Sequence, residues 1–236
     1  MQQKDFVINA LLKNGKVATL SQLYHGTEVS SWQTKTPFAS IRRILQTNKE
    51  FFKIQPGLWG LSEFKNEILA KFDIKNEKIV AENEFTHSYY QGIITQIGNI
   101  RKFKTYIPPQ DKNKIFINQK LGEVANLGEI YEFSYKNIVK FAKTIDVVWF
   151  NERNLPNSFF EVEHSTDFKN SLNKFYELQD FRANFVIVAK KERFSQFQNI
   201  IEASIYSPIR PFVKFADYES IVKQYEKESV KVENGI

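Results

Sequence analysis

From residue 84 to residue 228, segments with helical spacing of apolar residues alternate with short runs of β-branched and aromatic residues. Asp167 is the residue type that caps a helix, and the wholly apolar run in NFVIVAKK is typical of a buried strand. This alternation predicts an α/β (α+β) fold with a mixed sheet. The predicted helices are residues 84–99, 167–182, 194–202 and 217–228, and the predicted strands are 103–107, 146–150, 159–165, 185–189 and 211–216.

Residues 1–64 have a different pattern, with three amphipathic segments followed by a hairpin. Asn14-Gly15 ends the first helix, Thr19 caps the second, Thr36-Pro37 opens the third, and Gln55-Pro56-Gly57 forms the tip of the hairpin. We therefore expect a separate amino-terminal domain. The expected organisation is a domain at 1–64, a linker or helix at 65–81, a second domain at 82–228 and a frayed tail at 229–236.

The predicted hairpin TIDVVWFNERNLPNSFFEVEHS carries three carboxylates, Asp146, Glu161 and Glu163. If Phe150 lies opposite Phe159, then Asp146 lies opposite Glu163, with Glu161 one diagonal step away. Like charges on such an apolar face are costly unless a proton or a cation neutralises them. Oxygen ligands favour Mg²⁺ over Zn²⁺, and the chain has no cysteine. Carboxylates near strand ends can also be solvated or paired with lysine, so this alternative stays open.

Asp146 together with Glu161-Val162-Glu163 resembles the signature of the PD-(D/E)XK nucleases, and the order of elements resembles their αβββαβ core. Glu163 stands where the family's lysine is usual, as in a subset of type II restriction endonucleases. The resemblance implies Mg²⁺-dependent, sequence-specific cleavage of double-stranded DNA by a restriction-endonuclease-like domain. It also implies that Asp146 and Glu161 bind the metal and that Glu163 orients or deprotonates the attacking water.

Two further residues are candidates for this site. Some nucleases of the family place an extra acid on the first core helix, which makes Glu84 a candidate metal ligand, with an ordinary helix-surface residue as the alternative. Lys169 is the best placed of the lysines that could stabilise the transition state, with a solvated side chain as the alternative. The three histidines are given no catalytic role: His87 is not assigned to the site, His164 is expected in the core, and His25 near a helix end.

The amino-terminal domain looks like a winged helix, and the segment TPFASIRRILQTNKEFFKIQPGLWGLS resembles the HARE-HTH domain. In a helix-turn-helix the third helix enters the major groove, and its outward side chains here carry donors for bases and phosphates. The alternative is a protein-docking module. The predicted DNA contacts of this domain are Ser40, Arg42, Arg43 and Gln46, flanked by Lys35 and Lys53.

The net charge of +6 favours a polyanionic partner, and 42% hydrophobic residues favour a globular chain. The strongest local bias is in residues 101–120, which contain six basic residues and one acid. We expect this segment to face DNA, although a solvated loop would have the same composition. Its predicted DNA contacts are Arg101, Lys102, Lys104 and Lys112.

No signal-peptide pattern or long apolar run is present, so the cytoplasm is the expected compartment. A symmetric duplex target requires two active sites, so a homodimer is expected, with a monomer still possible. A restriction function also implies a cognate DNA methyltransferase. The alternative function is a transcriptional regulator whose nuclease-like domain is catalytically inactive.

Overall fold

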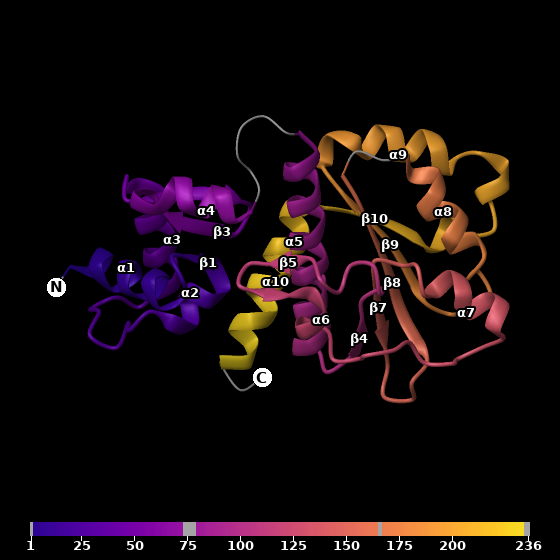
Figure 1. The fold of residues 1–236 in the computed structure, drawn as a ribbon, viewed down its shortest axis with the longest axis horizontal. Helices are drawn as coiled ribbons and strands as arrows, with labels where there is room; N and C mark the ends of the chain where they lie inside the picture. Colours follow the sequence, from indigo (N-terminus) through magenta and orange to yellow (C-terminus); the bar gives the residue numbers. More distant parts are fainter. Residues whose placement is uncertain (1, 73–78, 165–166, 234–236) are drawn as a thin grey trace. The chain divides into compact units, whose positions relative to one another are not determined.

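The computed structural model describes residues 2–72, 79–164 and 167–233, with the backbone alone for 79–84 and 231–233. The chain forms two compact units, Met1–Phe85 and Thr86–Ile236. Each unit has its own sheet and contains buried hydrophobic residues. Figure 1 shows the elements of both units.

The first unit combines short helices with a small antiparallel sheet in the order β1-β3-β2. Thr19 caps α2 as predicted, because its side chain accepts a hydrogen bond from the backbone N–H of Gln22. Gly57 supplies the positive φ of 75° at the tip of the β2-β3 hairpin. The elements are α1 (Gln3–Lys13), β1 (Val17–Thr19), α2 (Leu20–Gly26), α3 (Pro37–Thr47), β2 (Phe51–Gln55), β3 (Leu58–Leu61), η1 (Ser62–Phe64) and α4 (Lys65–Lys71).

The three helices and the hairpin of this unit agree with the prediction from sequence, and β1 is an addition to it. β1 is only three residues long and buried throughout, and Ala18 pairs with Trp59 of β3. A strand this short has no readable alternation, since its identity depends on pairing with a distant partner.

The second unit is built around a five-stranded mixed sheet in the order β10-β9-β8-β7-β4. β10, β9 and β8 are parallel, whereas β7 is antiparallel to both β8 and β4. This arrangement confirms the predicted α/β fold with a mixed sheet. The principal elements are α5 (Ile79–Ile100), β4 (Lys104–Tyr106), β7 (Val147–Phe150), β8 (Pro156–Glu163), α8 (Phe168–Tyr176), β9 (Asn184–Ala189), α9 (Phe194–Ile201), β10 (Val213–Asp217) and α10 (Tyr218–Glu233).

Shorter elements connect these principal ones. A two-stranded ribbon and two short helices lie between β4 and β7, and single turns of 3-10 helix flank α9 and precede β10. They are β5 (Ile115–Phe116), β6 (Gln119–Lys120), α6 (Leu121–Val124), α7 (Lys136–Ala142), η2 (Lys191–Arg193), η3 (Ser204–Tyr206) and η4 (Arg210–Phe212).

Helices cover both faces of the large sheet. α7, α8 and α9 share one hydrophobic core with the strands, in which Phe159 and Phe185 stack and Phe175 packs against Phe185. α5 packs on the other face, where a Cβ at Gly98 would lie 2.6 Å from the indole nitrogen of Trp149. Glycine is required there for the helix to approach the sheet. The result is a three-layer arrangement of helices, sheet and helices (Figure 1).

The predicted register of the β7-β8 hairpin was wrong. Phe159 pairs with Val148 and not with Phe150, so the pairing moves by two residues and places Asp146 beside Glu161 and not beside Glu163. The cause is a tighter turn than expected: the side chain of Asn151 accepts from the backbone N–H groups of Arg153 and Leu155. β8 therefore begins at Pro156. A shift of two preserves side-chain alternation, so Glu161 and Glu163 stay on the face expected for them.

α10 continues beyond Glu228, the last residue of the predicted helix, and ends at Glu233. Ser229 is buried and its hydroxyl donates to the carbonyl oxygen of Tyr225. Arg101 forms an ion pair with Glu228 at 2.8 Å. These contacts hold residues after Glu228 in the helix, and they come from tertiary packing, which the local sequence does not reveal.

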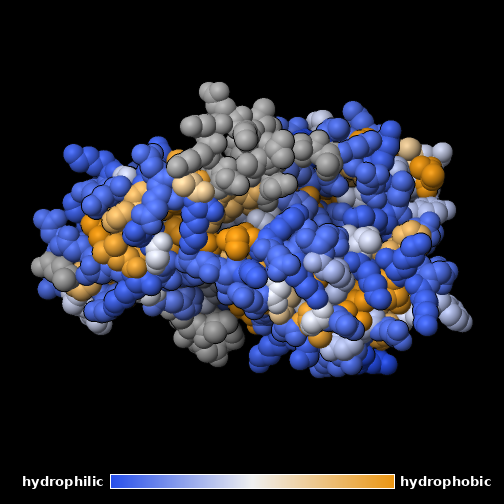
Figure 2. Space-filling model, in the orientation of Figure 1, coloured by the Kyte–Doolittle hydropathy of each residue, from blue (hydrophilic) through white to orange (hydrophobic). Residues whose placement is uncertain are grey.

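The face of the molecule in Figure 2 is mainly hydrophilic, with hydrophobic atoms in separate patches. Among the described side chains, the most exposed large hydrophobic one is Tyr135, at 79%, at the N-cap of α7. No helix in the described part of the chain combines the length and the apolar character needed to cross a membrane.

Candidate active site

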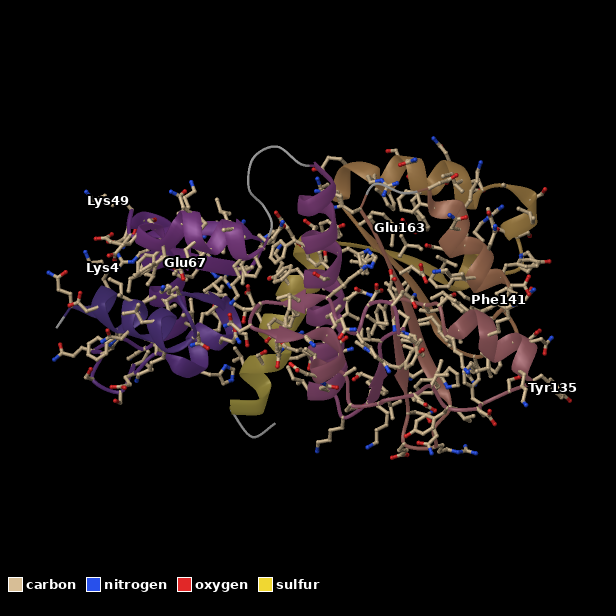
Figure 3. The ribbon with its side chains drawn as sticks, viewed as in Figure 1. Lys4, Lys49, Glu67, Tyr135, Phe141 and Glu163 are labelled. Carbon is tan, nitrogen blue, oxygen red and sulfur yellow. The ribbon has the colours of Figure 1, made fainter. Side chains whose placement is uncertain are left out.

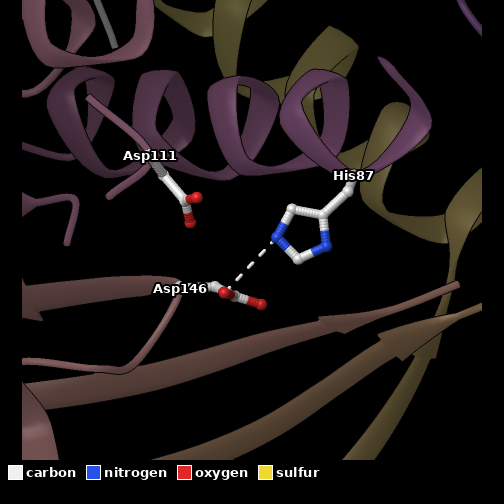
Figure 4. Close-up of side chains that lie close together, drawn as sticks. All are labelled: His87, Asp111 and Asp146. Atoms are coloured by element: carbon white, nitrogen blue, oxygen red, sulfur yellow. Dashed lines mark ion pairs between the residues drawn. The ribbon is translucent and has the colours of Figure 1, made fainter. Parts of the chain in front are cut away.

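Asp146 lies at the start of β7 and is 8% exposed. Its Oδ2 accepts a 2.7 Å hydrogen bond from the backbone N–H of Val162 on β8, and its Oδ1 lies 3.3 Å from Nε2 of His87 on α5 (Figure 4). Burial raises the pKa of Asp146, but the charge and hydrogen bond of His87, the Val162 N–H and Lys174 outweigh it. The net pKa of this carboxyl is therefore lowered.

Glu161 lies on β8 next to Asp146 and contacts a lysine and a serine from α8. Lys174 Nζ is 2.8 Å from Oε1 and 2.9 Å from Oε2, and Ser171 Oγ donates to Oε2 at 3.0 Å. Burial and the charge of Asp146 raise the pKa of Glu161 to about 8, although Lys174 and Ser171 act in the opposite direction. Glu161 can therefore hold a proton near neutral pH.

Glu163 ends β8 and shares Ser171 with Glu161, because the same hydroxyl also donates to Glu163 Oε1. The guanidinium of Arg193 donates to the backbone carbonyl oxygen of Glu163 at 2.9 Å. Burial raises the pKa of the Glu163 carboxyl, with Ser171 opposing the shift and Asp146 adding to it. In Figure 3, Glu163 lies within the second unit where the sheet meets its covering helices, whereas Tyr135 is at the outer surface.

A second set of polar side chains approaches Asp146 from the side of α5. Ligand atoms of His87, Asp111 and Asp146 lie within 4.8 Å of one another (Figure 4). Asp111 follows β4 and is 3% exposed, and its Oδ1 pairs with Lys114 Nζ at 2.7 Å. Burial lowers the pKa of His87, but its pair with Asp146 prevails and the net pKa is raised. This group joins an imidazole and two carboxylates in a set that suits a divalent cation.

The structure thus brings together the three acids predicted from sequence. Asp146 and Glu161 are neighbours across the β7-β8 pair, and Ser171 links Glu161 to Glu163. Glu161 is buried, and the ammonium of Lys174 is its positively charged partner.

Four residues of the site had been given no role from sequence: His87, Asp111, Ser171 and Lys174. Ser171 and Lys174 are three apart on α8, so they share one helix face, and this spacing could have identified them once the helix was known to cover β8. Asp111 is the single acid of the basic segment 101–120. A single acid among six basic residues could therefore have marked Asp111 as a candidate from sequence.

The other predicted site residues lie elsewhere or outside the described side chains. Lys169, in the first turn of α8, is exposed, with its Nζ 3.9 Å from Asp167. Glu84 belongs to α5, and its side chain is outside the part of the chain whose side chains are described. Arg101 pairs with Glu228, and Lys112 donates to the carbonyl oxygen of Gly128. Lys102 and Lys104 are exposed.

The predicted DNA contacts of the first unit lie on or beside α3. Arg42 Nη2 donates to the hydroxyl of Tyr24 at 3.1 Å, and Ser40 Oγ donates to the carbonyl oxygen of Thr36 at 3.3 Å. The outward-facing members of the set are exposed: Lys35, Arg42, Arg43, Gln46 and Lys53.

Comparison with known proteins identifies the family of this site. Residues 68–234 match the family described as "Type II restriction enzyme NmeDI C-terminal domain", which is most of the chain. The chain belongs to this family. The range that matches the NmeDI C-terminal domain family includes all seven residues of the site: His87, Asp111, Asp146, Glu161, Glu163, Ser171 and Lys174.

The chain is also similar to the Type II restriction enzyme NmeDI of Neisseria meningitidis serogroup C. The two are 28% identical over 116 residues, which is 45% of this chain and 33% of that protein. The match thus spans about a third of the length of that restriction enzyme. No solved structure matches the chain.

Proposed function

We propose that this protein is a type II restriction endonuclease that hydrolyses double-stranded DNA at specific sequences. The observation that carries the proposal is the buried group of Asp146, Glu161 and Glu163 with Lys174, on the inner strands β7 and β8 of a mixed sheet in a chain of the NmeDI C-terminal domain family. Buried carboxylates that repel one another are costly to keep, so such a group points to chemistry more than to stability.

The site is proposed to be of the PD-(D/E)XK type, with Mg²⁺ held by Asp146 and Glu161. The fit rests on two features of these residues: both are buried carboxylates on neighbouring strands, and the charge of Asp146 contributes to the raised pKa of Glu161. A divalent cation would relieve that repulsion. When bound, it lowers the pKa of a coordinated water and offsets the negative charge of the phosphate. Glu84 stays a proposed additional ligand.

The protein's own groups can supply the other requirements of phosphodiester hydrolysis. Glu163 has a raised pKa because it is buried, which suits a group that takes a proton from the attacking water. Lys174 supplies the positive charge that the usual motif lysine would supply, but from α8 instead of β8. Lys169, the lysine favoured from sequence, stays a rival for this role. Ser171 fixes the orientation of both glutamates.

The first unit is proposed to be a winged helix of the HARE-HTH kind that grips the duplex. Its order of three helices, a strand after the first helix and a carboxyl-terminal hairpin supports this, as do exposed arginines on α3. A homodimer would place two active sites on a symmetric target, and a cognate methyltransferase would protect the host DNA. Arg42, Arg43, Gln46 and Ser40 are the proposed base or phosphate contacts.

The test is incubation of the full chain with plasmid DNA and MgCl₂. Discrete fragments whose formation EDTA abolishes are expected, and Asp146→Asn should remove cleavage while DNA binding is retained. Asp180→Asn, an exposed substitution of the same kind, is the matched control and should cut like the unaltered protein. Binding without any cleavage by the unaltered protein would contradict the proposal and favour an inactive regulator.

A further inference from the structure

We infer that His87, Asp111 and Asp146 form a binding site for a divalent transition metal, with Mn²⁺ or Co²⁺ preferred over Mg²⁺. The inference concerns metal binding alone, so it can hold or fail independently of the DNA cleavage proposed above. It uses two residues, His87 and Asp111, that the proposed nuclease motif leaves without a role.

The geometry points to a chelating group. The three ligand atoms lie within 4.8 Å of one another and come from three separate elements: α5, the loop after β4 and the start of β7 (Figure 4). Asp146 Oδ2 is occupied by the N–H of Val162, so Oδ1 is the oxygen left for a metal, and it faces His87. A cation bound to Oδ1 would therefore face the imidazole.

Gln91 provides an independent observation. It lies one turn after His87 on α5 and is fully buried, and its Nε2 donates to Asp111 Oδ2 at 2.8 Å and to the carbonyl oxygen of Asp146 at 3.2 Å. The amide is thereby fixed against two of the three ligand residues, yet its buried Oε1 has no hydrogen-bond partner among the described residues. A buried acceptor without a donor is costly. A water in the coordination shell of a metal would provide that donor.

The charges are consistent with one bound divalent cation. In the structure, the negative charges of Asp111 and Asp146 face Lys114 at 2.7 Å and the imidazole of His87 at 3.3 Å. A divalent cation could balance both carboxylates with a neutral imidazole as the third ligand. The Lys114 side chain is 38% exposed and can move into solvent when a cation enters. The Lys114 ammonium and the metal thus compete for the carboxylate of Asp111.

The ligand set also determines which metal is preferred. Mg²⁺ is bound mainly by oxygen ligands and waters, whereas first-row transition metals also accept an imidazole nitrogen. One imidazole with two carboxylates, leaving positions for water, suits Mn²⁺ or Co²⁺.

The experiment titrates the full chain with MnCl₂ without DNA, and the free ion is followed by its electron paramagnetic resonance signal. His87→Gln and Asp111→Asn are expected to weaken Mn²⁺ binding at least about tenfold. Lys114→Gln is expected to tighten it, because the competing ammonium is gone, and this exposed substitution does not threaten folding. His25→Gln on α2 is the matched control and should bind Mn²⁺ like the unaltered protein.

Three results would overturn the inference. In the first, folded His87→Gln and Asp111→Asn bind Mn²⁺ as tightly as the unaltered protein does. In the second, Lys114→Gln binds Mn²⁺ no more tightly than the unaltered protein. In the third, the unaltered protein binds Mg²⁺ more tightly than Mn²⁺. If Glu161→Gln alone abolishes binding, the metal lies at the Asp146 and Glu161 pair. The inference then fails while the proposed nuclease site stands.

Discussion

Lys174 Nζ on α8 lies within 2.9 Å of both carboxylate oxygens of Glu161 on β8. The lysine also donates to the carbonyl oxygen of Thr144, so its position is fixed by two elements. Burial lowers the pKa of Lys174, but Glu161 more than compensates, and the net pKa is raised. The ammonium thus stays charged beside Glu161, where the proposed cleavage mechanism needs a cation.

Lys174→Gln is expected to reduce the rate of DNA cleavage by about a hundredfold, since it removes a fixed positive charge from the site. The measurement is single-turnover cleavage of plasmid at saturating MgCl₂, with circular dichroism to verify folding. Lys140→Gln on α7, an exposed lysine, is the matched control. A larger loss in Lys169→Gln than in Lys174→Gln would assign the role to Lys169.

Ser171→Ala is expected to reduce the free energy of unfolding by about 1–3 kcal/mol. Ser171 is fully buried and donates to Glu161 and Glu163, so its loss leaves buried carboxyl oxygens with one partner fewer. Urea unfolding measures the change. Asn170→Ala, the exposed neighbour on the same helix, should stay within about 0.5 kcal/mol of the unaltered protein. Equal stabilities of the two variants would show that Ser171 does not support the glutamates.

The metal-free protein is expected to lose stability as the pH rises from about 5 to about 9. The pKa of Glu161 is about 8 in the folded protein and 4.5 ordinarily. The folded state therefore binds its proton more tightly, and this stabilisation is complete below 4.5 and lost as the pH rises through about 8. His87, whose pKa is also raised, acts in the same direction above 6.5, whereas the lowered pKa of Asp146 matters only in acid.

Urea unfolding at pH 5, 7 and 9 without metal measures this dependence. Glu161→Gln should flatten it by an amount on the order of a few kcal/mol between the extremes. His87→Gln should flatten it to a smaller degree. An unchanged pH dependence in Glu161→Gln would show that this carboxyl does not hold the proton.

Much of the second unit could be predicted from sequence, because its strands are short apolar runs and its helices have clear spacing. Asp146, Glu161 and Glu163 were found because they interrupt such runs. Lys174 and His87 were not found, because a residue on a helix reaches the site only through the way that helix packs on the sheet. The hairpin register depended on one turn, set by the Asn151 side chain and the left-handed φ of 60° at Asn154.

The turn can be tested directly. Asn151→Ala should reduce the free energy of unfolding by about 1–2 kcal/mol, because two backbone N–H groups lose their acceptor. Asn154→Gly should leave stability unchanged or raise it, since glycine adopts a positive φ without strain. Urea unfolding of both variants is the measurement. Destabilisation by Asn154→Gly with none by Asn151→Ala would contradict this turn geometry.

Arg43 on α3 provides the test of the first unit as a DNA-binding domain. It is exposed and bound to no other side chain in the described hydrogen bonds and ion pairs, whereas Arg42 contacts Tyr24. If α3 enters the major groove, Arg43→Ala should weaken specific DNA binding by about 1–3 kcal/mol. If Arg43 contacts phosphate instead, the loss should be uniform across sequences, and the dependence of affinity on salt should decrease by about one unit of slope.

Fluorescence anisotropy with labelled duplexes, over a range of salt concentrations and with CaCl₂ in place of MgCl₂, measures both quantities. Lys13→Ala on α1 is the matched control: Lys13 is exposed, pairs with Glu28 at 3.2 Å and is not among the predicted DNA contacts. It should change neither the affinity nor the salt dependence by more than a neutral surface substitution does. If Arg43→Ala also leaves both unchanged, α3 does not contact DNA, and the first unit is better explained as a protein-docking module. Since the proposed active site lies in the second unit, that outcome would change the proposed route to specificity without changing that site.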